Sequence, residues 1–187
     1  MSKESDFLTK YLPIAVAVGE DFSLNPAVIL AQAALEGNFG LSHGAKYRKN
    51  HFGITASGST NQYWDGTKTQ SSSSGLWFRV YKTDYDGFAD FARLITQKYK
   101  SCASKSYNTN EYAKCIAQSP YISEANGDNR QQYEATVETY ARKFQPIVDN
   151  FIKQKTIKKK IFIATVIVSL LVIGGYFTYY FIKQNKK

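Results

Sequence analysis

The feature that most constrains this chain is an uncharged run of 22 residues, IFIATVIVSLLVIGGYFTYYFI, at positions 161–182. As an α-helix, which rises about 1.5 Å per residue, this run is long enough to cross the hydrocarbon core of a bilayer, about 30 Å. Flanking lysines and nearby tyrosines are typical of membrane interfaces; here they are Lys158, Lys159, Lys160, Lys183, Lys186, Lys187, Tyr176, Tyr179 and Tyr180. A buried core helix is the alternative, but it would need a domain large enough to enclose it. The run predicts a single transmembrane helix.

The rest of the chain has the length of one domain. We expect that domain at residues 1–150, then a basic juxtamembrane linker at 151–160, the membrane helix at 161–182 and a basic tail at 183–187. The net charge of +9 comes mainly from the end of the chain, because eight of the 24 Lys and Arg residues lie from Lys153 onward. The sixteen Lys and Arg residues before Lys153 are almost balanced by fifteen Asp and Glu residues. A domain so close to neutrality predicts no nucleic-acid partner.

The two cysteines, Cys102 and Cys115, leave two interpretations open. They could close one loop in an oxidising compartment, but we favour a pair of half-buried free thiols. His43 and His51 lie far from them in the sequence and form no ligand pattern. We therefore expect no metal site and no cofactor.

Helical spacing predicts a mainly α domain. Apolar residues recur on one helix face from Phe7 to Val18, and a second, almost wholly apolar helix is expected after the capping residue Asn25. The helical period returns over 84–100 and over 131–152.

Between these helices the composition changes to Gly, Ser, Thr, Asn and aromatic residues. Short strand-like pieces at 51–55 and 76–81 predict a small β-hairpin lobe or a long loop at the edge of a cleft. The predicted fold class is thus α+β, mainly α.

Glu36 is the strongest chemical candidate. It stands at the end of the apolar segment AVILAQAAL, at the edge of a dry core, where loss of solvation is expected to raise its pKa and keep it protonated near neutral pH. A protonated glutamate in a cleft can act as a general acid. Buried acids also serve as capping or salt-bridged groups, so burial alone leaves both roles open.

Four motifs stand around and after Glu36 in a fixed order: LAQAALEGNFG (30–40), NHFGI (50–54), YWDG (63–66) and FRVYKT (78–83). Over roughly residues 8–145 the chain resembles the glucosaminidase domain of glycoside hydrolase family 73, whose pattern looks like AQ-A-x-LES-G-W-G, N-x-FGIK, W-x-G and FR-x-Y. The resemblance implies a two-lobed, lysozyme-like fold and the glycan strands of peptidoglycan as substrate. Glu36 aligns with the family's catalytic acid.

The chain departs from this family in two places. Gly37, Asn38 and Phe39 stand where the family usually has Ser-Gly-Trp. The family also commonly has a second glutamate in a Thr-x-Glu strand, whereas residues 67–77 contain no acid and place Gln70 near that position. Inverting hydrolysis needs a base opposite the acid, so this chain uses another group or needs none.

Three alternatives remain for the missing base. Asp65 in the YWDG turn is the nearest carboxylate, although an Asp before Gly usually holds the turn itself. Glu124, which lies three residues after Tyr121, is a second candidate base. We favour Tyr121 over it, as a stabiliser of the transition state, because the family has a tyrosine beside the acid in a similar segment. In the third alternative the enzyme has no base. The substrate's own 2-acetamido group assists cleavage, or its 6-hydroxyl closes a 1,6-anhydro ring as in lytic transglycosylases, and a single carboxyl group both donates and accepts the proton.

Candidates for sugar binding lie in the β lobe: Phe52, Tyr63, Trp64 and Trp77 could stack on sugar rings. For Phe52 and Trp77 we favour a place in the hairpin core. Asn50 and Gln70 are the polar candidates, Asn50 for an N-acetyl group.

The sequence thus predicts a lysozyme-like domain followed by a membrane helix. We expect a peptidoglycan hydrolase that cleaves the β-1,4 bond between N-acetylglucosamine and N-acetylmuramic acid. A lytic transglycosylase, a non-catalytic glycan-binding module and a structural membrane protein of a virion remain alternatives.

Charge also predicts a location. The first 22 residues carry acids and no small-residue cleavage pattern, so we expect no signal peptide. Five lysines at 153–160 against three after Ile182 favour a domain that faces the cytosol. A wall-degrading enzyme that is not exported suits the inner membrane of a phage virion, with capsid or other virion proteins as partners, and a bacterial inner membrane is the alternative.

Overall fold

The computed structural model describes residues 2–123 and 129–184, and of residues 167–168 and 170–184 it describes the backbone alone. The chain divides into a compact unit 1, Met1–Val148, and a unit 2, Asp149–Lys187. The described elements are α1 (Lys3–Phe22), α2 (Pro26–Glu36), α3 (His43–Arg48), β1 (Lys68–Gln70), β2 (Trp77–Arg79), α4 (Asp84–Lys98), α5 (Lys100–Ala103), α6 (Thr109–Gln118) and α7 (Arg130–Gln184). The domain boundaries that the sequence predicts at 150, 160 and 182 stay predictions.

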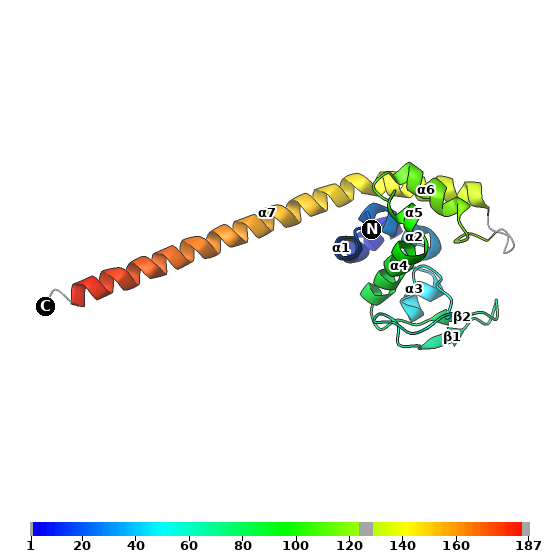
Figure 1. The fold of residues 1–187 in the computed structure, drawn as a ribbon, viewed down its shortest axis with the longest axis horizontal. Helices are drawn as coiled ribbons and strands as arrows, with labels where there is room; N and C mark the ends of the chain where they lie inside the picture. Colours follow the sequence, from blue (N-terminus) through cyan, green and yellow to red (C-terminus); the bar gives the residue numbers. More distant parts are fainter. Residues whose placement is uncertain (1, 124–128, 185–187) are drawn as a thin grey trace. The chain divides into compact units, whose positions relative to one another are not determined.

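Helix α2 is the centre of unit 1. Asn25 caps it, because its side chain accepts a hydrogen bond from the Ala27 N–H at 2.9 Å, and Pro26 occupies the first helical position. Every residue from Pro26 to Ala34 is buried. Helix α1 packs against α2 and α4, and in Figure 1 α3 and the β hairpin lie on the opposite side of α4 from α6. Both helices predicted in this part of the chain are confirmed.

The β lobe is smaller than the sequence predicts. Strands β1 and β2 pair antiparallel, with Thr69 opposite Phe78. The expected strand at 51–55 does not form in the described chain, where Thr55 makes only an isolated bridge to Phe78, because Gly53 takes a left-handed backbone conformation at φ 60° and turns the segment into a loop. Trp77 is 47% exposed, so its expected place in a hairpin core is wrong.

Helix α4 confirms the helix predicted from residue 84, and Thr83 and Asp86 form a capping box at its start. Helices α3, α5 and α6 are additions to the elements that the sequence predicts. The turn between α5 and α6 is held against α2, since Ser106 accepts a hydrogen bond from the Asn25 N–H at 3.3 Å on its hydroxyl and one from the Asn25 amide at 3.1 Å on its carbonyl.

That turn brings Cys102 of α5 and Cys115 of α6 together as a disulfide, with Cα atoms 5.4 Å apart. The interpretation of the two cysteines as free thiols is therefore wrong. The sequence did not predict α5 and α6, so it could not place the two side chains near each other.

Helix α7 belongs to both units. In unit 1 it buries Val137, Ala141, Phe144 and Val148, which recur every three or four residues and form one helix face. In the part of the chain that the structure describes, no helix has both the length and the apolar character that crossing a membrane requires. Most of the run expected to span a bilayer, 167–168 and 170–182, lies outside the residues whose side chains are described.

We predict that the disulfide contributes substantially to the stability of unit 1. It closes a loop with a sequence separation of 13 residues, for which loop-closure entropy gives about 3 kcal/mol. Replacing Cys102 and Cys115 together by serine should lower the free energy of unfolding by about this amount in urea titrations. As a control, a reductant should lower the stability of the parent chain and leave that of the double variant unchanged; equal stability of the two chains without reductant would contradict the prediction.

Candidate active site

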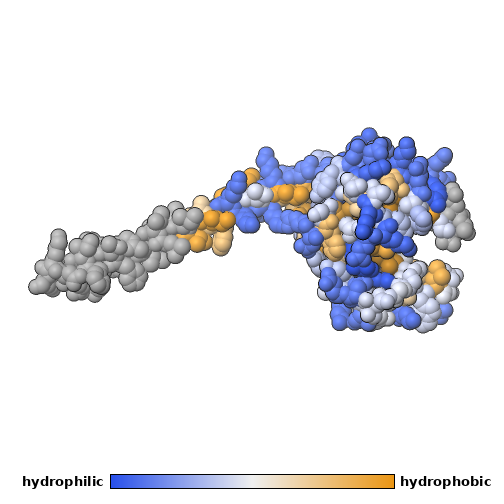
Figure 2. Space-filling model, viewed as in Figure 1, coloured by the Kyte–Doolittle hydropathy of each residue, from blue (hydrophilic) through white to orange (hydrophobic). Residues whose placement is uncertain are grey.

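A cavity of about 590 Å³ opens between the β hairpin and the helices of unit 1, and Figure 2 shows the surface hollowed at this place. Its volume is in the range of small-molecule binding sites. The lining residues come from α2, the loop at 52–57, β2 and the residue before it, α4 and the residue after it, the segment at 121–122 after α6, and the first turn of α7. The cavity therefore gathers residues that lie far apart in the sequence.

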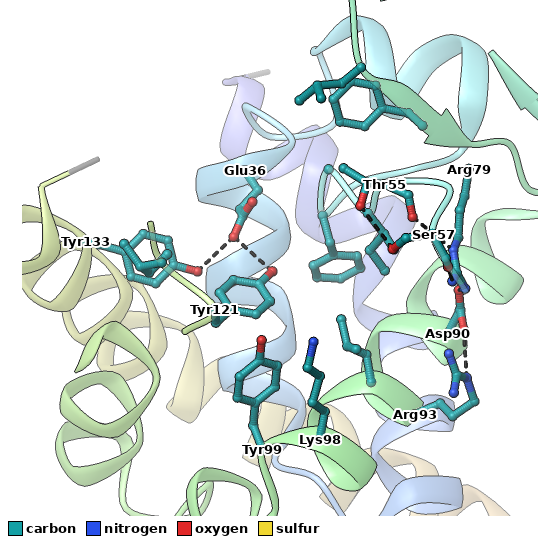
Figure 3. Close-up of a pocket in the computed structure, with 17 residues that line it drawn as sticks. Glu36, Thr55, Ser57, Arg79, Asp90, Arg93, Lys98, Tyr99, Tyr121 and Tyr133 are labelled. Atoms are coloured by element: carbon teal, nitrogen blue, oxygen red, sulfur yellow. Dashed lines mark hydrogen bonds and ion pairs between the residues drawn. The ribbon is translucent and has the colours of Figure 1, made fainter. Parts of the chain in front are cut away.

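Glu36, the last residue of α2, lies half-buried in the wall of this cavity. Its Oε1 atom accepts two hydrogen bonds, from the Tyr133 hydroxyl at 2.8 Å and from the Tyr121 hydroxyl at 3.1 Å (Figure 3). The loop passes beside Oε2 at Gly53, where a Cβ would lie 3.8 Å from that oxygen, an ordinary van der Waals distance. Because Oε1 is the acceptor of two donors, the proton of the acid form belongs on Oε2.

A chain of hydrogen bonds through Gln32 orients one of these donors, the Tyr133 hydroxyl. Tyr112 donates to Oε1 of Gln32 at 2.5 Å, and Nε2 of Gln32 donates to the Tyr133 hydroxyl at 2.9 Å. Since Tyr133 accepts from that amide, its own proton is directed at Glu36. Burial, and then the charge of Glu36, raise the pKa of Tyr121 and of Tyr133 well above the ordinary value, so both hydroxyls stay protonated donors at any physiological pH.

The far wall of the cavity is built on a buried ion pair. Nη1 of Arg79 bonds Oδ2 of Asp90 at 2.7 Å, and the remaining guanidinium donors bond the Thr55 carbonyl at 3.2 Å and the Ser57 carbonyl. Asp90 accepts further hydrogen bonds from Tyr81, Arg93 and Asn61. Burial raises the pKa of Asp90, but the hydrogen bonds from Tyr81 and Arg93 and the charge of Arg79 together lower it by more, so that it lies below the ordinary value. Asp90 is thus an ionised structural group.

The structure brings three of the predicted site residues together: Glu36, Tyr121 and Phe52 line the same cavity. Phe52 is only 3% exposed and stacks on Phe91 with ring centroids 3.8 Å apart. It forms part of the cavity wall and leaves little surface for a sugar ring.

The other predicted site residues lie away from that cavity. Asn50 is buried, and its amide donates to the carbonyls of Ile54 at 2.8 Å and Arg79 at 3.0 Å. Gln70 is exposed and bonds the Gly75 carbonyl at 2.9 Å, near the turn of the hairpin. Both amides thus hold the backbone of the β lobe.

Tyr63, Trp64 and Asp65 line a separate small pocket of about 90 Å³. Trp64 is buried, and the Arg79 guanidinium lies over its ring, with Cζ 4.1 Å from the ring centroid. The hydroxyl and N–H of Thr67, and then Lys82, lower the pKa of Asp65 to about 2. Asp65 thus holds the turn, as its position before glycine indicates.

Gln32 and Tyr133 are site residues that were not predicted from the sequence. Gln32 stands one turn before Glu36 on α2, a spacing that could have indicated it. Tyr133 lies 97 residues from Glu36, and no local pattern indicates their contact. Glu124 lies outside the described residues. Within 2–123 and 129–184 no cluster of three or more His, Cys, Asp or Glu side chains is suited to a metal ion.

Solved structures share this fold. The glycoside hydrolase domain of FlgJ from Salmonella typhimurium is 20% identical with a TM-score of 0.59, over 86% of this chain and 99% of that one. The catalytic domain of the autolysin Auto from Listeria monocytogenes is 22% identical with a TM-score of 0.57, over 80% and 88%. A peptidoglycan hydrolase from Sphingomonas sp. A1 is 20% identical in a mutant form, with a TM-score of 0.54, over 73% and 91%. These likenesses confirm the mainly helical, lysozyme-like fold with a small two-stranded sheet.

No curated protein sequence matches this chain. A family model does: glucosaminidase, described as mannosyl-glycoprotein endo-beta-N-acetylglucosaminidase, matches residues 12–153, which is more than half of the chain. The match includes Glu36, both of its tyrosine partners and the whole cavity wall. The chain therefore belongs to the glucosaminidase family and is a glycosidase.

Proposed function

We propose that this glycosidase hydrolyses peptidoglycan, cleaving the β-1,4 bond between N-acetylglucosamine and N-acetylmuramic acid, with Glu36 as the general acid. The observation that carries the proposal is the Glu36 carboxyl group in the cavity wall, held at Oε1 by the hydroxyls of two half-buried tyrosines. The Sphingomonas protein that shares the fold is a peptidoglycan hydrolase by name, which supports this choice of substrate.

The proton on Oε2 is the one available to the glycosidic oxygen. Its transfer lets the bond between that oxygen and the anomeric carbon break, and positive charge then develops on the sugar. The Glu36 carboxylate that remains keeps the two tyrosine hydrogen bonds, which strengthen as charge appears on Oε1. The tyrosine pair is therefore expected to stabilise the transition state more than the ground state.

The second half of the reaction favours help from the substrate. Among the described residues of the cavity wall, the carboxylates are Glu36 and Asp90, and two arginines and a tyrosine already bond Asp90. The 2-acetamido oxygen can instead attack the anomeric carbon as the leaving group departs. Water then opens the resulting ring and gives a proton to the Glu36 carboxylate, which restores the acid. Attack by the 6-hydroxyl in place of water would give the 1,6-anhydro product of a lytic transglycosylase.

Glu36→Gln tests the proposed acid, because it removes the proton donor and keeps the side-chain volume. We expect activity on purified peptidoglycan, followed by loss of turbidity, to fall about a hundredfold or more. An unchanged melting temperature would show that the fold is intact. Activity above a tenth of the parent level would overturn the assignment of Glu36.

Mass analysis of the glycan ends released by the parent chain distinguishes the two outcomes of the second step. Reducing ends are expected for hydrolysis, and anhydro ends would establish transglycosylation. A Glu124→Gln variant that lost as much activity as Glu36→Gln would show that an enzyme base exists after all.

Tyr133→Phe should lower kcat about tenfold with little change in KM. The variant removes one hydrogen bond to a carboxylate, for which about 1.5 to 3 kcal/mol is typical, and leaves the substrate-facing surface nearly unchanged. Tyr85→Phe is the matched control, because the Tyr85 hydroxyl bonds Asp21 outside the cavity. If both variants retain the same kcat, the hydrogen bond of Tyr133 to Glu36 has no part in the reaction.

A membrane anchor at residues 161–182 also stays a proposal, supported by the uncharged run and its flanking lysines. The lysine count favours a cytosolic unit 1, whereas disulfides such as Cys102–Cys115 persist in oxidising compartments. Carriage on the inner membrane of a phage virion, with capsid or other virion proteins as partners, followed by delivery to the cell wall, would satisfy both. A bacterial inner membrane with unit 1 outside the cytosol is the alternative.

Fractionation of cells that express the full chain tests the anchor and its orientation. We expect the chain in the membrane fraction after carbonate extraction, because 22 uncharged residues provide the required hydrophobic length. Protease added to intact spheroplasts should leave unit 1 intact if it faces the cytosol. Release of the chain by carbonate would contradict the anchor, and digestion of unit 1 from outside would contradict the cytosolic orientation.

A further inference from the structure

Helix α4 presents a stripe of side chains to the cavity. Asp90, Leu94 and Lys98 follow one another at intervals of four residues, so they lie on one helix face, and all three line the cavity. In Figure 3 the Lys98 side chain extends from the end of α4 toward the region between Tyr121 and the far wall. The stripe thus begins with a buried carboxylate and ends with an exposed ammonium.

Lys98 differs from the other two cations of the wall in its partners. Arg79 and Arg93 both bond Asp90, at 2.7 and 2.8 Å. The Lys98 ammonium forms no ion pair or hydrogen bond with a residue in the described ranges, and it lies 6.0 Å from the centroid of the Tyr99 ring. Lys98 is therefore available to a ligand in the cavity.

The described part of the wall is positive. Among the lining residues that the structure describes, the three cations Arg79, Arg93 and Lys98 stand against the one ionised carboxylate of Asp90, which leaves two positive charges when Glu36 is in its acid form. The residues before Lys153 are almost neutral, with sixteen Lys and Arg against fifteen Asp and Glu. Excess positive charge is thus concentrated where the substrate binds, and a concave wall of one sign raises the local concentration of opposite charge.

We propose that Lys98 binds a carboxylate carried by the muramic acid residue of the glycan, and so determines which substrates the enzyme prefers. The inference rests on the proposed function and adds a group that the N-acetylated sugar backbone does not itself provide. N-acetylmuramic acid offers such a carboxylate in two ways: its lactyl group where that is free, and the acidic residues of the peptide where one is attached. A Lys98 ammonium can pair with either, as a flexible point charge that does not require a fixed donor geometry.

The experiment compares three substrates of equal sugar length: glycan with attached peptides, glycan with free lactyl groups, and an N-acetylglucosamine oligomer that has no carboxylate. Lys98→Gln should raise KM about fivefold on the carboxylate-bearing substrates, the upper end for an exposed ion pair, and leave kcat unchanged. KM for the uncharged oligomer should stay the same. Lys98→Arg should restore most of the difference, because it keeps the charge.

Lys100→Gln is the matched control, since Lys100 is an exposed lysine two positions further on that does not line the cavity. It should change none of the three KM values. The substrate on which Lys98→Gln acts identifies the carboxylate. A loss confined to the peptide-bearing glycan indicates the peptide, a loss confined to the glycan with free lactyl groups indicates the lactyl group, and a loss on both indicates that the ammonium pairs with either carboxylate.

Binding measured in the Glu36→Gln background gives the same comparison without any cleavage, which separates this inference from the proposed reaction. If the parent chain cleaves no glycan but Lys98→Gln still weakens binding of the charged glycans alone, the proposed function fails and the carboxylate site stands. Equal effects of Lys98→Gln on all three ligands, or no effect on any, would overturn the carboxylate site.

Discussion

The buried pair of Arg79 and Asp90 is the interaction on which the shape of the cavity depends. Three-residue strands are too short to be stable alone, and the hairpin is tied to α4 because Arg79 on β2 bonds Asp90 on α4. The same guanidinium fixes the loop at the Thr55 and Ser57 carbonyls. Removing one partner of such a pair typically costs about 3–5 kcal/mol, because the other charge is left buried. The far wall of the cavity therefore forms or fails as one unit.

Glu36 is supported in a different way. Its helix is buried over nearly its whole length, so the position of the carboxyl group is set by the core, and its orientation by tyrosines from two later segments. The amide of Gln32 determines which way the Tyr133 proton points. The rigid carboxyl group of Glu36 thus faces a wall held by the ion pairs of Asp90, and the cavity lies between two elements that are stabilised independently.

How much could be predicted from the sequence depends on the range of the interactions. Helix α2 and Glu36 were predictable because Asn25, Pro26 and the apolar run are local signals. The disulfide was not predictable, because the turn that brings its cysteines together is held by a hydrogen bond between Ser106 and Asn25, 81 residues earlier in the chain. The alternating pattern of β2 predicted a strand, but alternation does not tell which face is covered, so the exposure of Trp77 was missed. Asn50 was predicted to bind sugar and Asp65 to act as a base, but both are turn-forming residues whose side chains hydrogen-bond to the backbone.

The same distinction bears on the missing base. Gln70 lies in β1, near the position of the family's second glutamate. The Gln70 amide donates a hydrogen bond to the Gly75 carbonyl and so holds the hairpin. A carboxylate that must accept a proton from water needs to be ionised and without strong donors, whereas Asp90 is ionised because its donors are strong. The donors that keep Asp90 charged thus also prevent it from acting as a base. This arrangement of the described wall supports the proposal that the N-acetyl group of the substrate supplies the nucleophile, with Glu36 as the acid.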